Sequence, residues 1–170
     1  MKPEHARPGP PRVLARTEAE IGAAACIPAP QAEVFAFLSD LENHWRLTDR
    51  FVAVLDLAGP PGARHGGRVR IRGPLGLRRT AVTRVLDASE PAWLRGVAEI
   101  RGTTARVQWS LESCDGSTDV RLEAAVLEAQ PLDRLVLALG GRWWLRRRFH
   151  ATLECLVQRF RAPAQATLAS

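Results

Sequence analysis

Apolar and polar residues alternate along several short stretches of the chain, a pattern typical of strands with one covered and one solvated face. Val120, Leu122 and Ala124 are separated by Arg121 and Glu123, and the same alternation runs through residues 105–111. Turn-forming Gly, Pro, Asp and Ser residues separate the stretches. The pattern predicts an antiparallel meander with strands over residues 18–27, 51–57, 68–72, 77–86, 93–100, 103–111 and 119–127.

Two short helices are predicted between the first two strands. Pro30 fits the first turn of a helix, and apolar residues follow it at helical spacing. Ser39-Asp40 provides a cap for a second short helix that carries Trp45.

A long helix is predicted from Pro131 to Arg161, where large apolar residues recur every three or four positions. Its apolar stripe is expected to cover the apolar face of the sheet. Gly140-Gly141 interrupts this segment, and each glycine costs about 1 kcal/mol in a helix relative to alanine. We therefore expect a kink at that point.

The chain of 170 residues is long enough for one ordinary domain. Residues 1–17 hold four of the 12 prolines and few large apolar groups, so they are expected to form a flexible tail. Residues 162–170 are expected to form a second flexible tail. The predicted domain spans residues 18–161.

The segment from Ile27 to Trp45 contains the run PAPQAEVFAFLSDLENHW. This run, together with the order of the predicted elements, resembles the START-like (SRPBCC) superfamily, which includes the polyketide cyclase/dehydrase and lipid transport proteins and the Bet v1-like helix-grip fold. The resemblance implies an α+β fold in which a curved antiparallel sheet of about seven strands wraps around the long C-terminal helix. It also implies an apolar cavity between the sheet and that helix.

Large apolar residues on the predicted inner faces are the candidates for the wall of this cavity. For the tryptophans among them, ordinary core packing is an equally open interpretation. The candidates are Phe37, Trp45, Phe51, Val69, Ile71, Trp109, Leu122, Leu139, Trp143 and Phe149.

The net charge of +6 is unevenly distributed along the chain. Residues 61–84 contain seven arginines and no acidic residue, and residues 131–170 carry a net charge of +5. Arginines near the implied cavity entrance are candidates for contact with an acidic head group: Arg72, Arg78, Arg142 and Arg146. The solvated face of a strand or helix explains the same arginines without any ligand.

The sequence contains few residues in a pattern typical of a catalytic site. The four histidines and three cysteines follow no metal-ligand spacing, and no nucleotide-binding or hydrolase motif occurs, so we expect neither a metal nor a cofactor. His150 and His44 are the candidates for a general acid or base. A structural role with a satisfied hydrogen bond is the alternative for both.

These observations predict a cytoplasmic protein that binds a hydrophobic small molecule (a lipid, a polyketide or an isoprenoid-like compound) as a carrier or sensor. One alternative is a polyketide aromatase/cyclase that acts on a poly-β-keto chain. Another is a basic module that docks on an anionic membrane surface or an acidic protein. The predicted sheet lacks exposed aromatic residues in a stacking pattern, which argues against nucleic acid as the partner.

Overall fold

The computed structural model describes residues 21–48, 51–73 and 76–167, with side chains as far as Arg161. The expected N-terminal tail, residues 1–17, lies outside the described residues. Residues 18–20 of the predicted first strand and residues 168–170 at the C-terminus also lie outside them.

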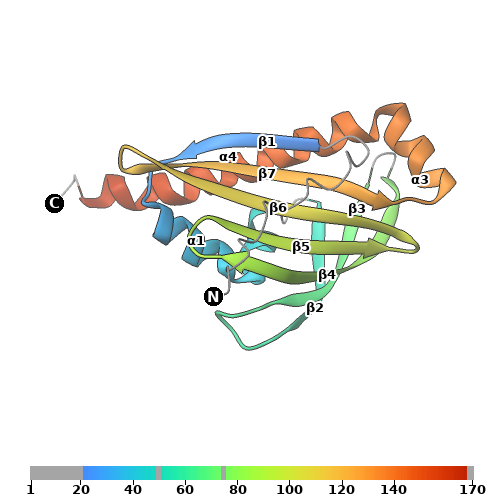
Figure 1. Ribbon diagram of the computed structural model, residues 1–170, viewed down its shortest axis with the longest axis horizontal. Helices are drawn as coiled ribbons and strands as arrows, with labels where there is room; N and C mark the ends of the chain where they lie inside the picture. The colour runs from blue at the N-terminus through green and yellow to red at the C-terminus, as the bar shows by residue number, and fades with distance from the viewer. Residues whose placement is uncertain (1–20, 49–50, 74–75, 168–170) are drawn as a thin grey trace, which may run out of the picture.

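A single seven-stranded sheet forms the front layer of the molecule in Figure 1 and curves around the C-terminal helix. Every neighbouring pair is antiparallel, in the order β1-β7-β6-β5-β4-β3-β2, which confirms the predicted meander. β1 pairs with β7, so β1 and β2 form the two edges of the open sheet. The strands are β1 (Ile21–Ile27), β2 (Val52–Ala58), β3 (Gly66–Arg72), β4 (Arg78–Ser89), β5 (Trp93–Ile100), β6 (Thr103–Cys114) and β7 (Ser117–Glu128).

Two-residue turns connect β5 to β6 and β6 to β7. Arg101-Gly102 joins β5 to β6, with φ of 38° and 78°, and Asp115-Gly116 joins β6 to β7, with φ of 44° and 79°. Positive φ at both positions matches the right-handed twist of the flanking strands, and the second position then favours glycine. Both turns fall where the sequence predicts them.

Two short helices, α1 (Gln31–Ser39) and α2 (Leu41–Leu47), follow the first strand as predicted. The Asp40 side chain caps α2 by accepting a hydrogen bond of 2.9 Å from the backbone N–H of Glu42. The two helices lie together at one end of the sheet (Figure 1).

The C-terminal segment consists of α3 (Pro131–Val136), a wide turn η2 (Leu137–Gly141) and the long α4 (Arg142–Thr167). Gly140 adopts φ of 114°, and Leu139 also leaves the helical region, which confirms the predicted kink. The helix continues to Thr167, six residues beyond the end that the sequence predicts.

Two apolar clusters fill the interior at separate places. In the larger cluster, Leu153, Leu156 and Phe160 of α4 pack against α1 and against β1, β6 and β7. The smaller cluster consists of Val52, Val69 and Ala81 on β2, β3 and β4. Between these clusters the concave face of the sheet and the first half of α4 do not close on each other.

Candidate ligand-binding cavity

A cavity of about 350 Å³ lies between the concave face of the sheet, α2, and the segment from α3 to the first half of α4. This volume lies in the range of pockets that hold small molecules. Strands β2 to β7 all contribute to the wall, so the cavity follows the curvature of the sheet. Leu77, which lies next to the start of β4, also lines the cavity, and its side chain is exposed.

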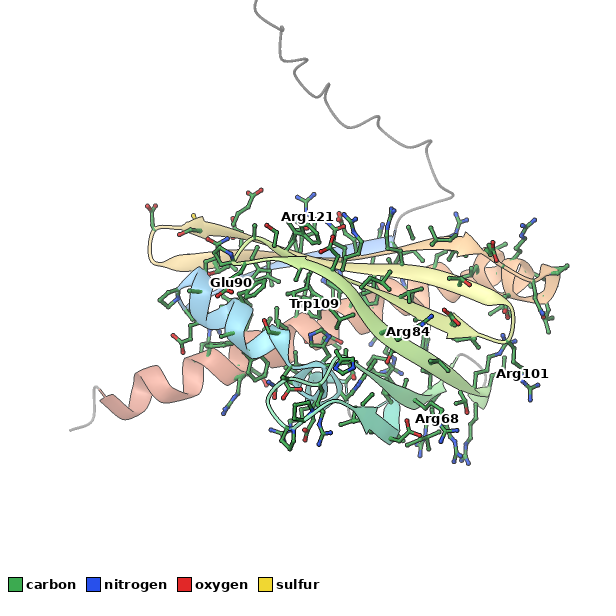
Figure 2. The ribbon with its side chains drawn as sticks, turned by 60° about the horizontal axis from the view of Figure 1, so that its bottom comes forward. Arg68, Arg84, Glu90, Arg101, Trp109 and Arg121 are labelled. Carbon is green, nitrogen blue, oxygen red and sulfur yellow. The ribbon has the colours of Figure 1, made fainter. Side chains whose placement is uncertain are left out.

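Apolar side chains form most of the wall. Trp109 lies opposite Leu94 on β5 and Leu122 on β7, and all three face the cavity. Figure 2 shows Trp109 between the sheet and the helices behind it. Small residues widen the space farther along these strands, since Ala98 and Ala105 face each other across β5 and β6.

Gly96 adds to this space because its position excludes a side chain. A Cβ atom there would lie 2.8 Å from the carbonyl oxygen of Arg84, closer than real Cβ contacts. The adjacent strand β4 has an irregular register between Val85 and Asp87, and such bulges bend a strand. The close approach at Gly96 and the irregularity together increase the local curvature of the sheet.

The structure brings six of the ten predicted wall residues into the lining: Trp45, Phe51, Ile71, Trp109, Leu122 and Phe149. Two of the others are packed elsewhere. Phe37 meets Phe160 edge-on, with ring centroids 5.7 Å apart, in the larger apolar cluster. Val69 is fully buried in the smaller cluster, where Phe51 and Ile71 cover it.

The remaining two, Leu139 and Trp143, lie outside the lining and are 77% and 66% exposed. Leu139 lies in the kink, where the backbone leaves the helical conformation. The wide turn also rotates α4 about its axis relative to an uninterrupted helix, so that different side chains face the sheet. As a result Trp144 faces the cavity and its neighbour Trp143 faces outward.

None of the four predicted head-group arginines (Arg72, Arg78, Arg142 and Arg146) lines the cavity; all four are exposed. The register of β3 and β4 explains why Arg72 and Arg78 lie outside the lining. Arg79 pairs with Ile71, whose side chain faces the cavity, whereas Arg72 pairs with Arg78 on the other face. Directly paired residues of antiparallel strands share a face, so Arg79, and neither Arg72 nor Arg78, lines the cavity.

Arg79, Asp133 and Thr103 form a polar cluster in the wall. The Asp133 carboxylate accepts hydrogen bonds from the guanidinium of Arg79 and from the hydroxyl of Thr103. Asp133 is largely buried, and its charge is compensated by these two donors. The cluster ties α3 to β4 and β6 beside the cavity. Sequence reasoning missed it, although Asp133 is the only acidic residue between positions 131 and 153.

Arg148, which is not among the four candidate head-group arginines, also lines the cavity. Its guanidinium carbon lies 5.1 Å from the ring centroid of Phe51 and 5.2 Å from that of Trp144. The two rings meet edge-on at 6.1 Å. Among the described residues, no carboxylate lies within 4 Å of Arg148. The cavity wall therefore holds a cation stabilised by aromatic faces and open to an anionic partner.

His44 lines the cavity beside Trp109, with ring centroids 5.4 Å apart. Its Nε2 lies 2.6 Å from the carbonyl oxygen of Leu38. Since a carbonyl only accepts, Nε2 carries the proton and Nδ1 is left as an acceptor. Burial lowers the pKa of His44 from 6.5 to about 4, with a partial offset from the Leu38 hydrogen bond and the charge of Asp40. The ring is therefore neutral at pH 7. His150, by contrast, is exposed on α4 and outside the lining.

This pKa predicts a pH dependence of stability. Between pH 6.5 and pH 4 the unfolded chain binds a proton at His44 that the folded chain excludes, so stability falls as the pH falls through this range. From pH 7 to pH 5, His44 alone should lower the free energy of unfolding by about 2 kcal/mol. Urea denaturation at both pH values measures the change. In His44→Gln the fall should be smaller by this amount, and an unchanged pH slope in the variant would contradict the assignment.

Within the part of the chain that the structure describes, no group of three or more His, Cys, Asp or Glu side chains is placed to hold a metal ion. In the same residues, no helix combines the length and the apolar character that spanning a membrane requires.

Comparison with known proteins extends the picture. The family model described as polyketide cyclase / dehydrase and lipid transport matches residues 18–161. No curated protein matches this chain significantly.

Solved structures with the same fold include a protein from Thermus thermophilus, at 19% identity and a TM-score of 0.65, with 85% of this chain and 99% of that one covered. A START superfamily protein from Mycobacterium smegmatis aligns at 14% identity and a TM-score of 0.61, covering 84% of this chain and 97% of the other. At such identities the similarity shows the fold alone. It agrees with the START-like fold that the segment from Ile27 to Trp45 implies. Because the family model matches most of the length of this chain, the chain belongs to the polyketide cyclase / dehydrase and lipid transport family.

Proposed function

We propose that this protein binds a predominantly apolar small molecule, of lipid, polyketide or isoprenoid type, and acts as its carrier or sensor. The observation that carries the proposal is the cavity of about 350 Å³ with a mostly apolar wall. Each 100 Å² of apolar surface that a ligand buries there contributes about 2.5 kcal/mol to affinity. The three cysteines of the chain are free thiols, which supports the accompanying proposal of a reducing, cytoplasmic location.

Arg148 supports a ligand with an acidic group at one end. A guanidinium without a carboxylate partner, held between Phe51 and Trp144 in an apolar wall, gains from pairing with an anion. The paired guanidinium of Arg79 is less suited to this role, because Asp133 already neutralises it.

The test compares a long-chain fatty acid with the alcohol of the same chain length, both displacing a fluorescent apolar probe. The wild type is expected to prefer the acid. Arg148→Gln should reduce this preference by about tenfold or more and change the affinity for the alcohol little, because a hydrogen bond to a charged group contributes about 1.5–3 kcal/mol.

Arg146→Gln is the matched control, since Arg146 lies two residues away on the same helix but is exposed and outside the lining. It should leave both affinities unchanged. Equal losses of acid and alcohol binding in Arg148→Gln would contradict the head-group role. Native mass spectrometry of protein purified from its own host would identify a ligand that co-purifies.

A second candidate function is cyclisation of a poly-β-keto chain, which His44 favours. Its imidazole lines the cavity, and Nδ1 is unprotonated at neutral pH. However, a pKa of about 4 makes His44 a weak proton acceptor, since a general base works best with a pKa near the working pH. Because the pKa of His44 lies well below neutral pH, we favour ligand binding over catalysis as the function. A cyclised product from a poly-β-keto thioester, lost in His44→Gln while probe binding is retained, would reverse the order.

A further inference from the structure

Exposed apolar side chains occur along α3, η2 and the start of α4. Leu132, Leu135, Leu139 and Trp143 are spaced three or four residues apart, and each is between 54% and 77% exposed. We call these four residues the apolar row. Large apolar groups that gather at one place on a surface indicate a contact surface.

Four exposed arginines flank the apolar row: Arg134, Arg142, Arg146 and Arg147. The guanidinium of Arg147 lies 5.6 Å from the ring centroid of Trp143. The only carboxylate between positions 131 and 153 is that of Asp133, which is turned inward and paired with Arg79. This surface is therefore both apolar and strongly positive.

The same segments line the cavity on their inner side. Val136, Leu137 and Trp144 face the interior, while the apolar row faces solvent one or two positions away. The lining residue Leu77 is exposed as well. Anything bound to the apolar row would lie on the outer side of a segment that forms part of the cavity wall.

We propose that the apolar row and its four arginines form a docking surface for an anionic lipid bilayer. The leucines and Trp143 enter the headgroup region, where amphipathic indole rings are favoured, and the arginines contact lipid phosphates. Charge complementarity selects this partner. A second copy of the chain would bring two sets of arginines together, and like charges across an interface are unfavourable. The docking surface goes beyond ligand binding, because it supplies a route by which an apolar ligand passes between membrane and cavity.

Vesicle co-sedimentation of the full chain tests the proposal without any cavity ligand. The vesicles consist of phosphatidylcholine alone, or of phosphatidylcholine and phosphatidylglycerol at about 7:3. We expect binding to the anionic vesicles at about 50 mM salt and a loss of at least about tenfold at about 500 mM salt or without phosphatidylglycerol. Failure of the wild type to sediment with anionic vesicles at low salt would overturn the proposal.

Matched single substitutions locate the surface. Arg146→Glu should weaken binding about 20-fold, because each arginine near an anionic surface contributes about fivefold and the change also adds a repulsive charge. Arg121→Glu makes the same charge change on the outer face of β7 (Figure 2) and should alter binding less than about twofold. Leu139→Ser should weaken binding several-fold, and Leu86→Ser, exposed on β4, should not.

Equal effects of Arg146→Glu and Arg121→Glu would show attraction by net charge alone and would overturn the assigned surface. A dimer that Leu139→Ser dissociates, without vesicle binding, would assign the row to self-association. Binding to immobilised poly-glutamate but not to vesicles would assign it to an acidic protein. Both results contradict the proposal, and neither bears on probe binding in the cavity, which is measured separately.

Discussion

Replacing Ala105 by tryptophan is expected to lower the affinity for an apolar ligand by about 100-fold or more. Ala105 faces the cavity from β6, directly opposite Ala98 on β5. An indole at this position fills much of the 350 Å³ that a ligand would use. Because the cavity is already empty space, the new side chain should fold into it with little loss of stability. Titration with a neutral fluorescent naphthylamine probe measures the affinity.

Arg106→Trp is the control for this prediction. Arg106 is the next residue on β6, and its side chain lies on the opposite face of the sheet, outside the lining. This variant should bind the probe as the wild type does. Wild-type affinity in Ala105→Trp, or equal losses in both variants, would show that ligands bind elsewhere.

Replacing Asp133 by alanine is expected to lower the free energy of unfolding by about 3 kcal/mol. The substitution leaves the guanidinium of Arg79 and the hydroxyl of Thr103 in the cavity wall without their common acceptor. It also removes the tie between α3 and the sheet. Urea denaturation measures the loss.

The double variant Arg79→Met with Asp133→Leu separates the cost of an orphaned charge from the value of the pair. Removing both partners of a buried ion pair costs much less than removing one. We therefore expect the double variant to be more stable than Asp133→Ala. If Asp133→Ala unfolds at the same urea concentration as the wild type, the cluster does not hold α3 in place.

Most of the architecture follows from local patterns in the sequence. Strict alternation and tight turns such as Asp115-Gly116 place the strands within a few residues of their true ends. Asp40 caps the second short helix, and Gly140 kinks the C-terminal segment, as their side chains and conformational freedom predict. The pairing of β1 with β7 has no such local pattern, because it joins residues about 100 positions apart.

The residues of the site are harder to predict than the fold. A shift of one residue along a strand moves a side chain from one face of the sheet to the other. Arg78 and Arg79 are indistinguishable by composition, and only the pairing of Arg79 with Ile71 shows which one faces inward. On the helix, the wide turn at Leu139 and Gly140 changes the phase, so Trp144 rather than Trp143 reaches the interior. Residues far from these irregularities, such as Trp109 and Leu122, lie in the lining as expected from alternation alone.

The pairing of the first strand with the last has a consequence for synthesis on the ribosome. The apolar residues of β1 and α1 pack against β7 and against Leu153, Leu156 and Phe160 of α4, which are translated long after them. Until those residues leave the exit tunnel, β1 and α1 lack the residues that bury their apolar surface. Nascent chains of this protein should therefore depend on chaperones until α4 has been translated, and truncation before residue 150 should yield aggregation rather than a smaller folded unit.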